Sequence, residues 1–95
     1  MNNSVKNYAD FRVSEDNEIL IILDEELFDP MKTITLKFSG DSITSVDGKI
    51  PLELTINHPE LVEDIKKCKK IHLVEKTDAG FFQIIPNIKL IRSNT

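Results

Sequence analysis

The residue types that could carry chemistry gather in one short part of the chain, which we call the acidic segment. It reads Asp24, Glu25, Glu26, Leu27, Phe28 and Asp29. A calcium site needs several oxygens that converge at about 2.3–2.6 Å, and its loop usually contains a glycine for the sharp turn. The acidic segment has no glycine, and its spacing does not fit the calcium-loop pattern. We therefore expect no metal there.

Two interpretations of the acidic segment remain open. It is either a solvated connection between two strands or a docking surface for a partner protein. The second interpretation requires Leu27 and Phe28 to be exposed and surrounded by charge. The four carboxylates suggest a further alternative, a nucleic-acid mimic of the kind used by phage-encoded inhibitors, in which they would project outward like phosphates.

No set of side chains predicts an enzyme. Cys68 and His72 stand four residues apart, but a helix and a strand are expected to meet between them, and the only other histidine is His58. The sequence SGDS at 39–42 falls in a turn and lacks the large scaffold of serine hydrolases. Phosphate-binding glycine motifs and paired cysteines are absent from the sequence. We expect no enzymatic activity, no cofactor and no metal site.

The charge distribution argues against nucleic acid as a partner. The net charge is −4, and residues 1–30 contribute −6 from eight acidic and two basic residues. The ten basic and eight acidic residues that follow leave +2, with lysines concentrated at 66–70. A nucleic-acid binder usually has a dominant basic face with aromatic or glycine-rich reading elements. The sequence shows no such combination.

Size and composition predict a single domain over residues 1–95, because two smaller units would bury too little apolar surface. Residues 1–7 are polar and are expected to be disordered. The single cysteine predicts a reducing compartment, and no leader segment is visible. The longest apolar run, Ile19–Leu23, is too short to cross a bilayer. We expect a cytoplasmic protein without a membrane partner.

Hydrophobic alternation predicts most of the strands. Ile34, Leu36 and Phe38 alternate with polar residues, as in a half-buried strand, and a meander of strands follows to residue 56. Residues 18–23 are apolar on both faces, which suits a central strand. Turns are expected at 14–17, at Gly40 and at 77–80, and Asp47-Gly48 fits a type I′ hairpin.

One helix is predicted over 57–70. Asn57 is a candidate N-cap, Pro59 suits the first turn, and Glu60 completes a capping box. Leu61, Val62, Ile65 and Cys68 form one apolar face.

These elements predict an α+β fold: a small curved antiparallel β-sheet or partly open β-barrel of five to seven strands, with one amphipathic helix. Phe81 and Phe82 are neighbours on a strand and should point to opposite faces, so that one ring enters the core and the other stays exposed unless it is covered. Several strands are apolar on both faces, which is more surface than one helix can cover. Either the sheet closes on itself or the protein oligomerises.

The resulting functional expectation is a non-enzymatic protein–protein interaction module, such as an adaptor, an assembly component, or an inhibitor or immunity-type protein. Its predicted binding residues are the acidic segment together with Phe81 and Phe82. The partner is another protein, and a homo-oligomer is compatible with the same surfaces. The alternative is a β-barrel domain that senses a small anionic ligand or nucleotide, with anion contacts from Lys66, Lys67, Lys69, Lys70 and Arg92.

Overall fold

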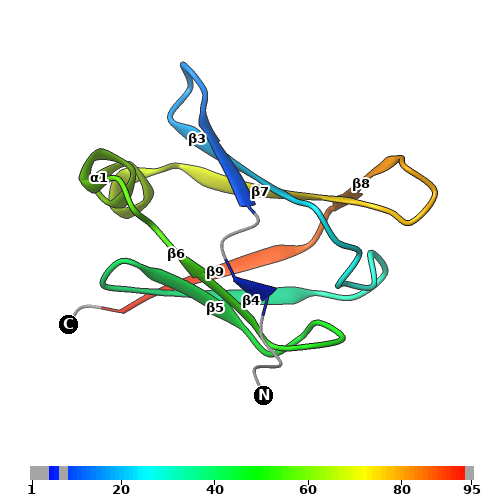
Figure 1. Cartoon of the computed structure of the whole chain (residues 1–95). Coiled ribbons are helices and arrows are strands. Elements are labelled where there is room, and N and C mark those ends of the chain that lie inside the picture. The colour runs from blue at the N-terminus through cyan, green and yellow to red at the C-terminus, as the bar shows by residue number, and fades with distance from the viewer. Residues whose placement is uncertain (1–4, 7–8, 94–95) are drawn as a thin grey trace.

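The chain folds into two layers of β-sheet with a helix at one end (Figure 1). The computed structural model describes residues 5–6 and 9–93 of the 95. In sequence order the elements are β1 Val5–Lys6, β2 Ala9–Val13, β3 Glu18–Leu23, β4 Ile34–Ser39, β5 Ser42–Ser45, β6 Leu52–Thr55, α1 Pro59–Lys67, β7 Lys70–Lys76, β8 Phe82–Ile85 and β9 Ile88–Arg92. The first sheet has the order β1-β6-β5-β4-β9, and the second sheet has the order β2-β3-β7-β8.

The α+β class and the predicted meander are confirmed, but the predicted sheet is wrong. The strands β4, β5 and β6 pair antiparallel in sequence order, as expected. However, the described residues form two sheets with more strands than five to seven, and both sheets are mixed, because β3 pairs parallel with β7 and β4 pairs parallel with β9. These partners are far apart in sequence, and alternation within a strand carries no information about such distant pairing.

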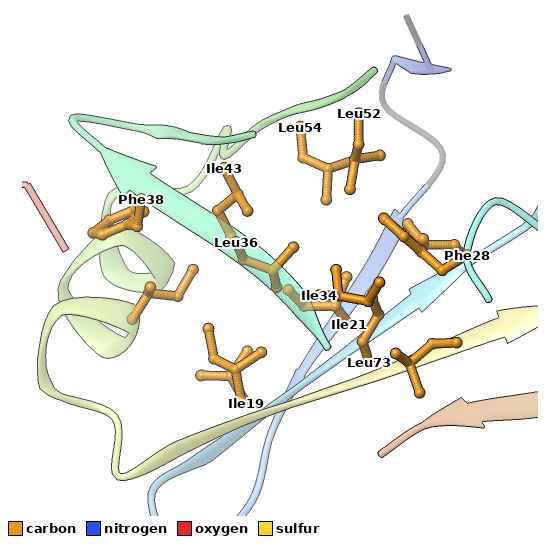
Figure 2. Packing of buried hydrophobic residues seen from close by; sticks show 14 of the residues in the cluster. Ile19, Ile21, Phe28, Ile34, Leu36, Phe38, Ile43, Leu52, Leu54 and Leu73 are labelled. Carbon is orange, nitrogen blue, oxygen red and sulfur yellow. The ribbon is translucent and has the colours of Figure 1, made fainter. Parts of the chain in front are cut away.

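The core lies between the two sheets and follows from the period-two pattern of their strands. In β3 the buried side chains are Ile19, Ile21 and Leu23, and in β4 they are Ile34, Leu36 and Phe38. Successive residues on a strand point to opposite faces, so each alternation supplies one apolar row to the interior. Figure 2 shows these rows facing each other across the interior.

The chain passes between the two sheets four times within the described residues. The segments that cross are β1 to β2, β3 to β4, β6 through α1 to β7, and β8 to β9. The helix closes one end of the space between the sheets, and the long β3–β4 connection lies at the opposite end (Figure 1). Ile65 and Cys68 are buried on the apolar face of α1, as predicted.

Two of the predicted glycine turns are confirmed and one is wrong. Gly40 and Gly80 have φ of 61° and 88°, the left-handed region that glycine enters without a Cβ penalty. Asn17 also has a positive φ of 62° in the predicted turn at 14–17. Gly48 is not in this region, and the β5–β6 connection spans residues 46–51 rather than a two-residue type I′ hairpin.

The helix begins later than predicted and without the expected capping box. The N-cap is His58, which makes no side-chain capping bond, and Pro59 occupies the first turn. The His58 carbonyl accepts bonds from the Leu61 and Val62 N–H groups. Asn57 is therefore one position too early to cap the first turn, and Glu60 stands too near the start to complete the box.

Side chains from β9 and from the β2–β3 turn hold the C-terminal end of α1. The Arg92 guanidinium donates to the Ile65 carbonyl at 3.2 Å and to the Cys68 carbonyl at 2.7 Å. The Asn17 side-chain amide donates to the Lys67 carbonyl at 3.0 Å. These carbonyls lack partners within the helix and carry the negative end of its dipole, so a cation and an amide are suitable donors.

The expected disorder at 1–7 falls largely outside the described residues. Residues 1–4 and 7 are not described, whereas Val5–Lys6 form β1, which pairs parallel with β6. Over the described part of the chain, no helix has the length and apolar character needed to span a membrane.

Replacing Arg92 by alanine should lower the free energy of unfolding by about 1–2 kcal/mol, because carbonyls at the end of α1 lose a charged donor. Urea denaturation measures the change. Lys89→Ala is the matched control, since Lys89 lies on the same strand and is exposed. Its effect should stay within about 0.5 kcal/mol. Equal effects of the two substitutions would show that Arg92 does not support the helix end.

Candidate functional site

Leu27 and Phe28 in the acidic segment are buried, which contradicts their predicted exposure. Leu27 is 4% exposed and Phe28 is 2% exposed. In Figure 2 the Phe28 ring lies in the core on the side away from the helix. The two side chains therefore close the open end of the sandwich and cannot dock a partner. In sequence, apolar residues between charged ones look the same whether they are buried or exposed. The charges on their neighbours do not indicate which way the apolar side chains point.

A buried carboxylate holds this segment in place. Glu75 is 0% exposed, and its Oε2 accepts the Leu27 N–H at 2.7 Å and the Phe28 N–H at 3.1 Å. Its Oε1 accepts the Gln83 side-chain amide at 3.0 Å. N–H donors thus surround both oxygens, which compensates for the loss of water around the carboxylate.

Sequence reasoning missed Glu75, although a signal was present. Ile71, Leu73 and Glu75 share one face of β7, and the first two are core residues. A carboxylate in register with an inward apolar row must find donors inside the protein. That register marks Glu75 as a structural residue.

The β5–β6 connection packs directly on the acidic segment and explains why Asp47-Gly48 is not a tight turn. The Lys49 N–H donates to the Leu27 carbonyl at 2.8 Å, and Asp47 Oδ2 accepts the Thr35 N–H at 2.7 Å. A Cβ on Gly48 would stand 3.2 Å from a ring carbon of Phe28 and 3.3 Å from the Leu27 carbonyl oxygen. Gly48 therefore permits a close approach of the two connections, and its φ does not lie in the left-handed region.

The charged side chains of the acidic segment remain at the surface. Asp24, Glu25 and Asp29 are exposed, and Glu26 is half-buried. Glu26 and Asp29 line a cleft of about 520 Å³ together with Lys32, Lys49 and Gln83 among others. Both signs of charge surround this cleft, so it has no clear preference for an anion or a cation. Because Gln83 belongs to β8, the cleft connects the acidic segment to that strand.

Both rings of the adjacent pair Phe81 and Phe82 are exposed, so the prediction that one of them enters the core is wrong. Phe81 is 72% exposed and Phe82 is 64% exposed. Phe81 precedes β8 in the turn from β7, where the Thr77 N–H donates to its carbonyl. The inward positions of the strand are Gln83 and Ile85, and only Ile85 reaches the core.

The outer face of the second sheet carries an apolar row. Ile22 pairs with Val74, and Val74 pairs with Ile84, so the three side chains stand side by side across β3, β7 and β8. Ile84 is 67% exposed. We call Phe81, Phe82 and Ile84, with Val74 and Ile22 beside them, the β8 surface.

The outer face of the first sheet lacks such an apolar row along its meander. Its outward positions on the meander are mainly polar, namely Thr35, Lys37, Ser42, Thr44, Glu53 and Thr55. The two sheets thus bury similar inner faces and differ at their outer faces.

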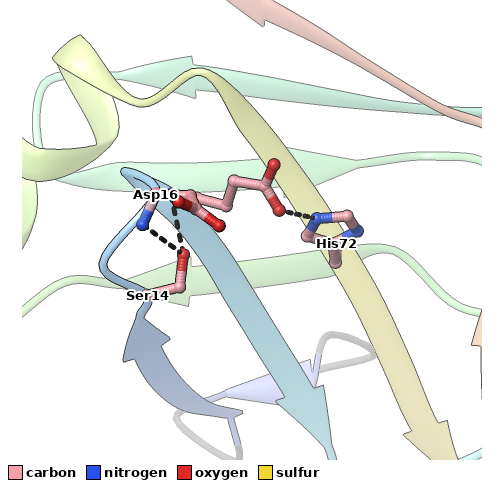
Figure 3. Close-up of polar contacts among 4 residues, drawn as sticks. Ser14, Asp16 and His72 are labelled. Carbon is pink, nitrogen blue, oxygen red and sulfur yellow. Dashed lines mark hydrogen bonds and ion pairs between the residues drawn. The ribbon is translucent and has the colours of Figure 1, made fainter.

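His72 and Cys68 are not brought together as a metal-binding pair. Cys68 is buried at the end of α1, where Arg92 Nη2 lies 3.2 Å from its sulfur. His72 Nε2 lies 2.7 Å from Glu18 Oε1 on the second sheet (Figure 3). Among residues 5–6 and 9–93, no three His, Cys, Asp or Glu side chains converge on a point where a metal ion could bind.

The lysines considered for anion binding surround the end of α1 and are exposed. Arg92, the fifth member of that predicted set, is occupied by the carbonyls of Ile65 and Cys68. Its guanidinium therefore stabilises the end of the helix.

The hydrogen bond from His72 lowers the pKa of the Glu18 carboxyl below its usual value of 4.5, and the nearby Lys69 and Lys70 add to the effect. Burial opposes this shift. The carboxylate form is the one that these partners stabilise.

Glu75→Gln should lower the free energy of unfolding by about 1–3 kcal/mol, because a neutral amide oxygen accepts the Leu27 and Phe28 N–H groups more weakly than the charged carboxylate does. Urea denaturation measures this change, and hydrogen exchange at the Leu27 and Phe28 amides should accelerate. Glu53→Gln on the outer face of the first sheet is the control and should be near neutral. Unchanged stability together with unchanged exchange would contradict the anchoring role of Glu75.

The Glu18 titration midpoint, followed by NMR of the side-chain carboxyl, should lie below 4.5 and should return toward it in His72→Gln. Lys70→Ala should move the midpoint less, since the Lys70 contribution is smaller. Because the folded-state pKa is depressed, the stability from this pair is present above the usual pKa and is lost as the pH falls through the folded-state pKa. An equal midpoint in the wild type and in His72→Gln would refute the assignment.

No protein-family model matches the chain, no curated protein matches it in sequence, and no solved structure matches its fold.

Proposed function

We propose that the chain is a non-enzymatic protein-interaction module that binds its partner at the β8 surface. The observation that supports this proposal is the exposure of Phe81, Phe82 and Ile84, each at least 64% exposed, on and beside one edge strand. Large apolar side chains that cluster at a surface, especially when polar residues surround them, are typical of protein-binding sites. An adaptor, an assembly component, or an inhibitor or immunity-type protein would each use such a surface.

The other exposed apolar residues do not form a comparable cluster on a strand. Met31 and Val46 lie in separate connections between strands, and Val13 and Ile91 stand singly on β2 and β9. Single exposed apolar residues of this kind are ordinary. The strand β8 differs because it combines two exposed large apolar side chains, Phe82 and Ile84, with a position at the edge of its sheet. An edge strand offers main-chain hydrogen bonds to a partner strand, and its alternate side chains provide specificity.

The acidic segment has a secondary role in this proposal. Its apolar residues are committed to the core, but Glu26 and Asp29 share a cleft with Gln83 of β8. Charges beside an apolar centre exclude wrong partners and accelerate association, and they contribute less to affinity. We therefore assign Glu26 and Asp29 to the rim of the binding surface, on the Gln83 side of β8, where Lys32 and Lys49 of the same cleft offset much of their charge.

A capture experiment with matched variants tests the proposal. The tagged wild type should retain a stoichiometric protein from the cells that express the chain. Ile84→Lys should reduce this capture by roughly tenfold or more, because it places a charge in the apolar centre. Val46→Lys is the control, since Val46 is 86% exposed but lies outside the β8 surface. Equal capture by all three proteins, or no capture by the wild type, would contradict the proposal. Circular dichroism verifies the fold of each variant.

A further inference from the structure

If the β8 surface binds a protein, as proposed above, the structure also indicates which protein that partner is. We infer that the surface binds a second copy of this chain, with the two β8 strands antiparallel about a two-fold axis at Gln83. The two four-stranded sheets would then join into one continuous sheet. Three properties of β8 support this pairing: the orientation of its backbone, the absence of charge along the strand, and the apolar area that it exposes.

The register between β7 and β8 fixes which backbone groups of β8 point to the open edge. The Thr77 N–H donates to the Phe81 carbonyl, so the backbone groups of Phe81 point toward β7. Antiparallel pairs alternate between bonded and non-bonded positions, so Gln83 and Ile85 also point theirs toward β7. Phe82 and Ile84 therefore direct their N–H and C=O groups outward. Over the described residues, no strand pairs with this edge.

One two-fold register satisfies all of these outward groups. With the axis at Gln83, Phe82 of each copy lies opposite Ile84 of the other, and both positions are of the bonded type. An axis at Ile84 would place Phe82 opposite Pro86, which has no N–H. An axis at Phe82 would place Ile84 opposite Gly80, whose φ of 88° belongs to the turn and not to a strand.

The side chains fit the same register. Phe82 and Ile84 share the outer face of the strand, so the axis creates two aromatic–aliphatic pairs across the junction. Each pair extends the row formed by Ile22, Val74 and Ile84 into the second copy.

The absence of charge favours a second copy. Two-fold pairing brings each charge near its own equivalent, which is unfavourable for a chain of net charge −4 unless the contact itself is neutral. Residues 79–88 form an uncharged run of ten in a chain in which 29% of residues are charged. Edge strands of monomeric proteins are usually protected by lysine or another charge, whereas β8 has none.

The exposed rings supply less area than a standard interface, so the expected dimer is weak. A standard interface removes about 800 Å² from each partner. An aromatic side chain contributes roughly 150–250 Å², so the two rings at 72% and 64% exposure supply roughly 200–340 Å². Ile84 and the strand backbone add to this area without reaching a large obligate interface. We expect a dimer whose population depends on protein concentration.

Sedimentation equilibrium on the purified wild type should show a reversible monomer–dimer equilibrium. Ile84→Pro removes an N–H that points to the open edge and makes no bond to β7, so it should raise the dimer dissociation constant roughly tenfold or more. Val46→Lys should leave the constant unchanged. A wild type that is monomeric at all concentrations, or equal dissociation constants for the wild type and Ile84→Pro, would overturn the inference.

Cysteine cross-linking tests the register independently of Ile84→Pro. Gln83 would face its own equivalent at a non-bonded position, where side chains approach most closely. Gln83→Cys should form an intermolecular disulfide under mild oxidation, whereas Val46→Cys, and the wild type with its buried Cys68, should not. Cross-linking at 83 that is no faster than at 46 would contradict the register. A monomeric wild type that still captures another protein in an Ile84-dependent way would refute the dimer and leave the proposed function intact.

Discussion

Apolar rows from the two sheets meet in the middle of the molecule, and their mutual burial positions the other elements. Ile19, Ile21 and Leu23 on one side and Ile34, Leu36 and Phe38 on the other are almost completely removed from water. Removing apolar surface from water is the main force that favours folding. Two sheets in contact still leave the ends of the interior open, and a chain of 95 residues must close these ends with the segments that connect the layers.

Each end is closed in a different way, and each requires a polar contact. At one end α1 places its apolar face over the core, and Arg92 and Asn17 bond the carbonyls where the helix ends. At the other end Leu27 and Phe28 enter the core, and Glu75 accepts their N–H groups. Burying a connection that has no secondary structure would leave its backbone groups without partners, so an internal acceptor is needed. The carboxylate of Glu75 provides one, and the acidic segment is thereby an element of the fold.

The two sheets contribute similar apolar faces to the core and differ in their outer faces. The outer faces therefore bear on function. The outer face of the first sheet is mainly polar along its meander, which suits contact with water. The second sheet ends in β8, where apolar side chains and outward backbone groups occur on the same strand. A partner strand satisfies both kinds of group at once, and this is the physical basis for a binding module that acts through its edge.

The sequence by itself determined the features that depend on neighbouring residues. Alternation identified Ile34, Leu36 and Phe38 as one buried row, glycine identified the turns at Gly40 and Gly80, and the spacing of Ile65 and Cys68 identified the buried face of the helix. Each is decided within a few residues by φ preference or by strand and helix period. Only the tertiary structure decided the division into two mixed sheets, the burial of Leu27 and Phe28, and the exposure of both Phe81 and Phe82. Glu75 lies 48 residues from Leu27 along the chain. Contacts at such separations depend on how the layers stack, and local pattern does not encode that stacking.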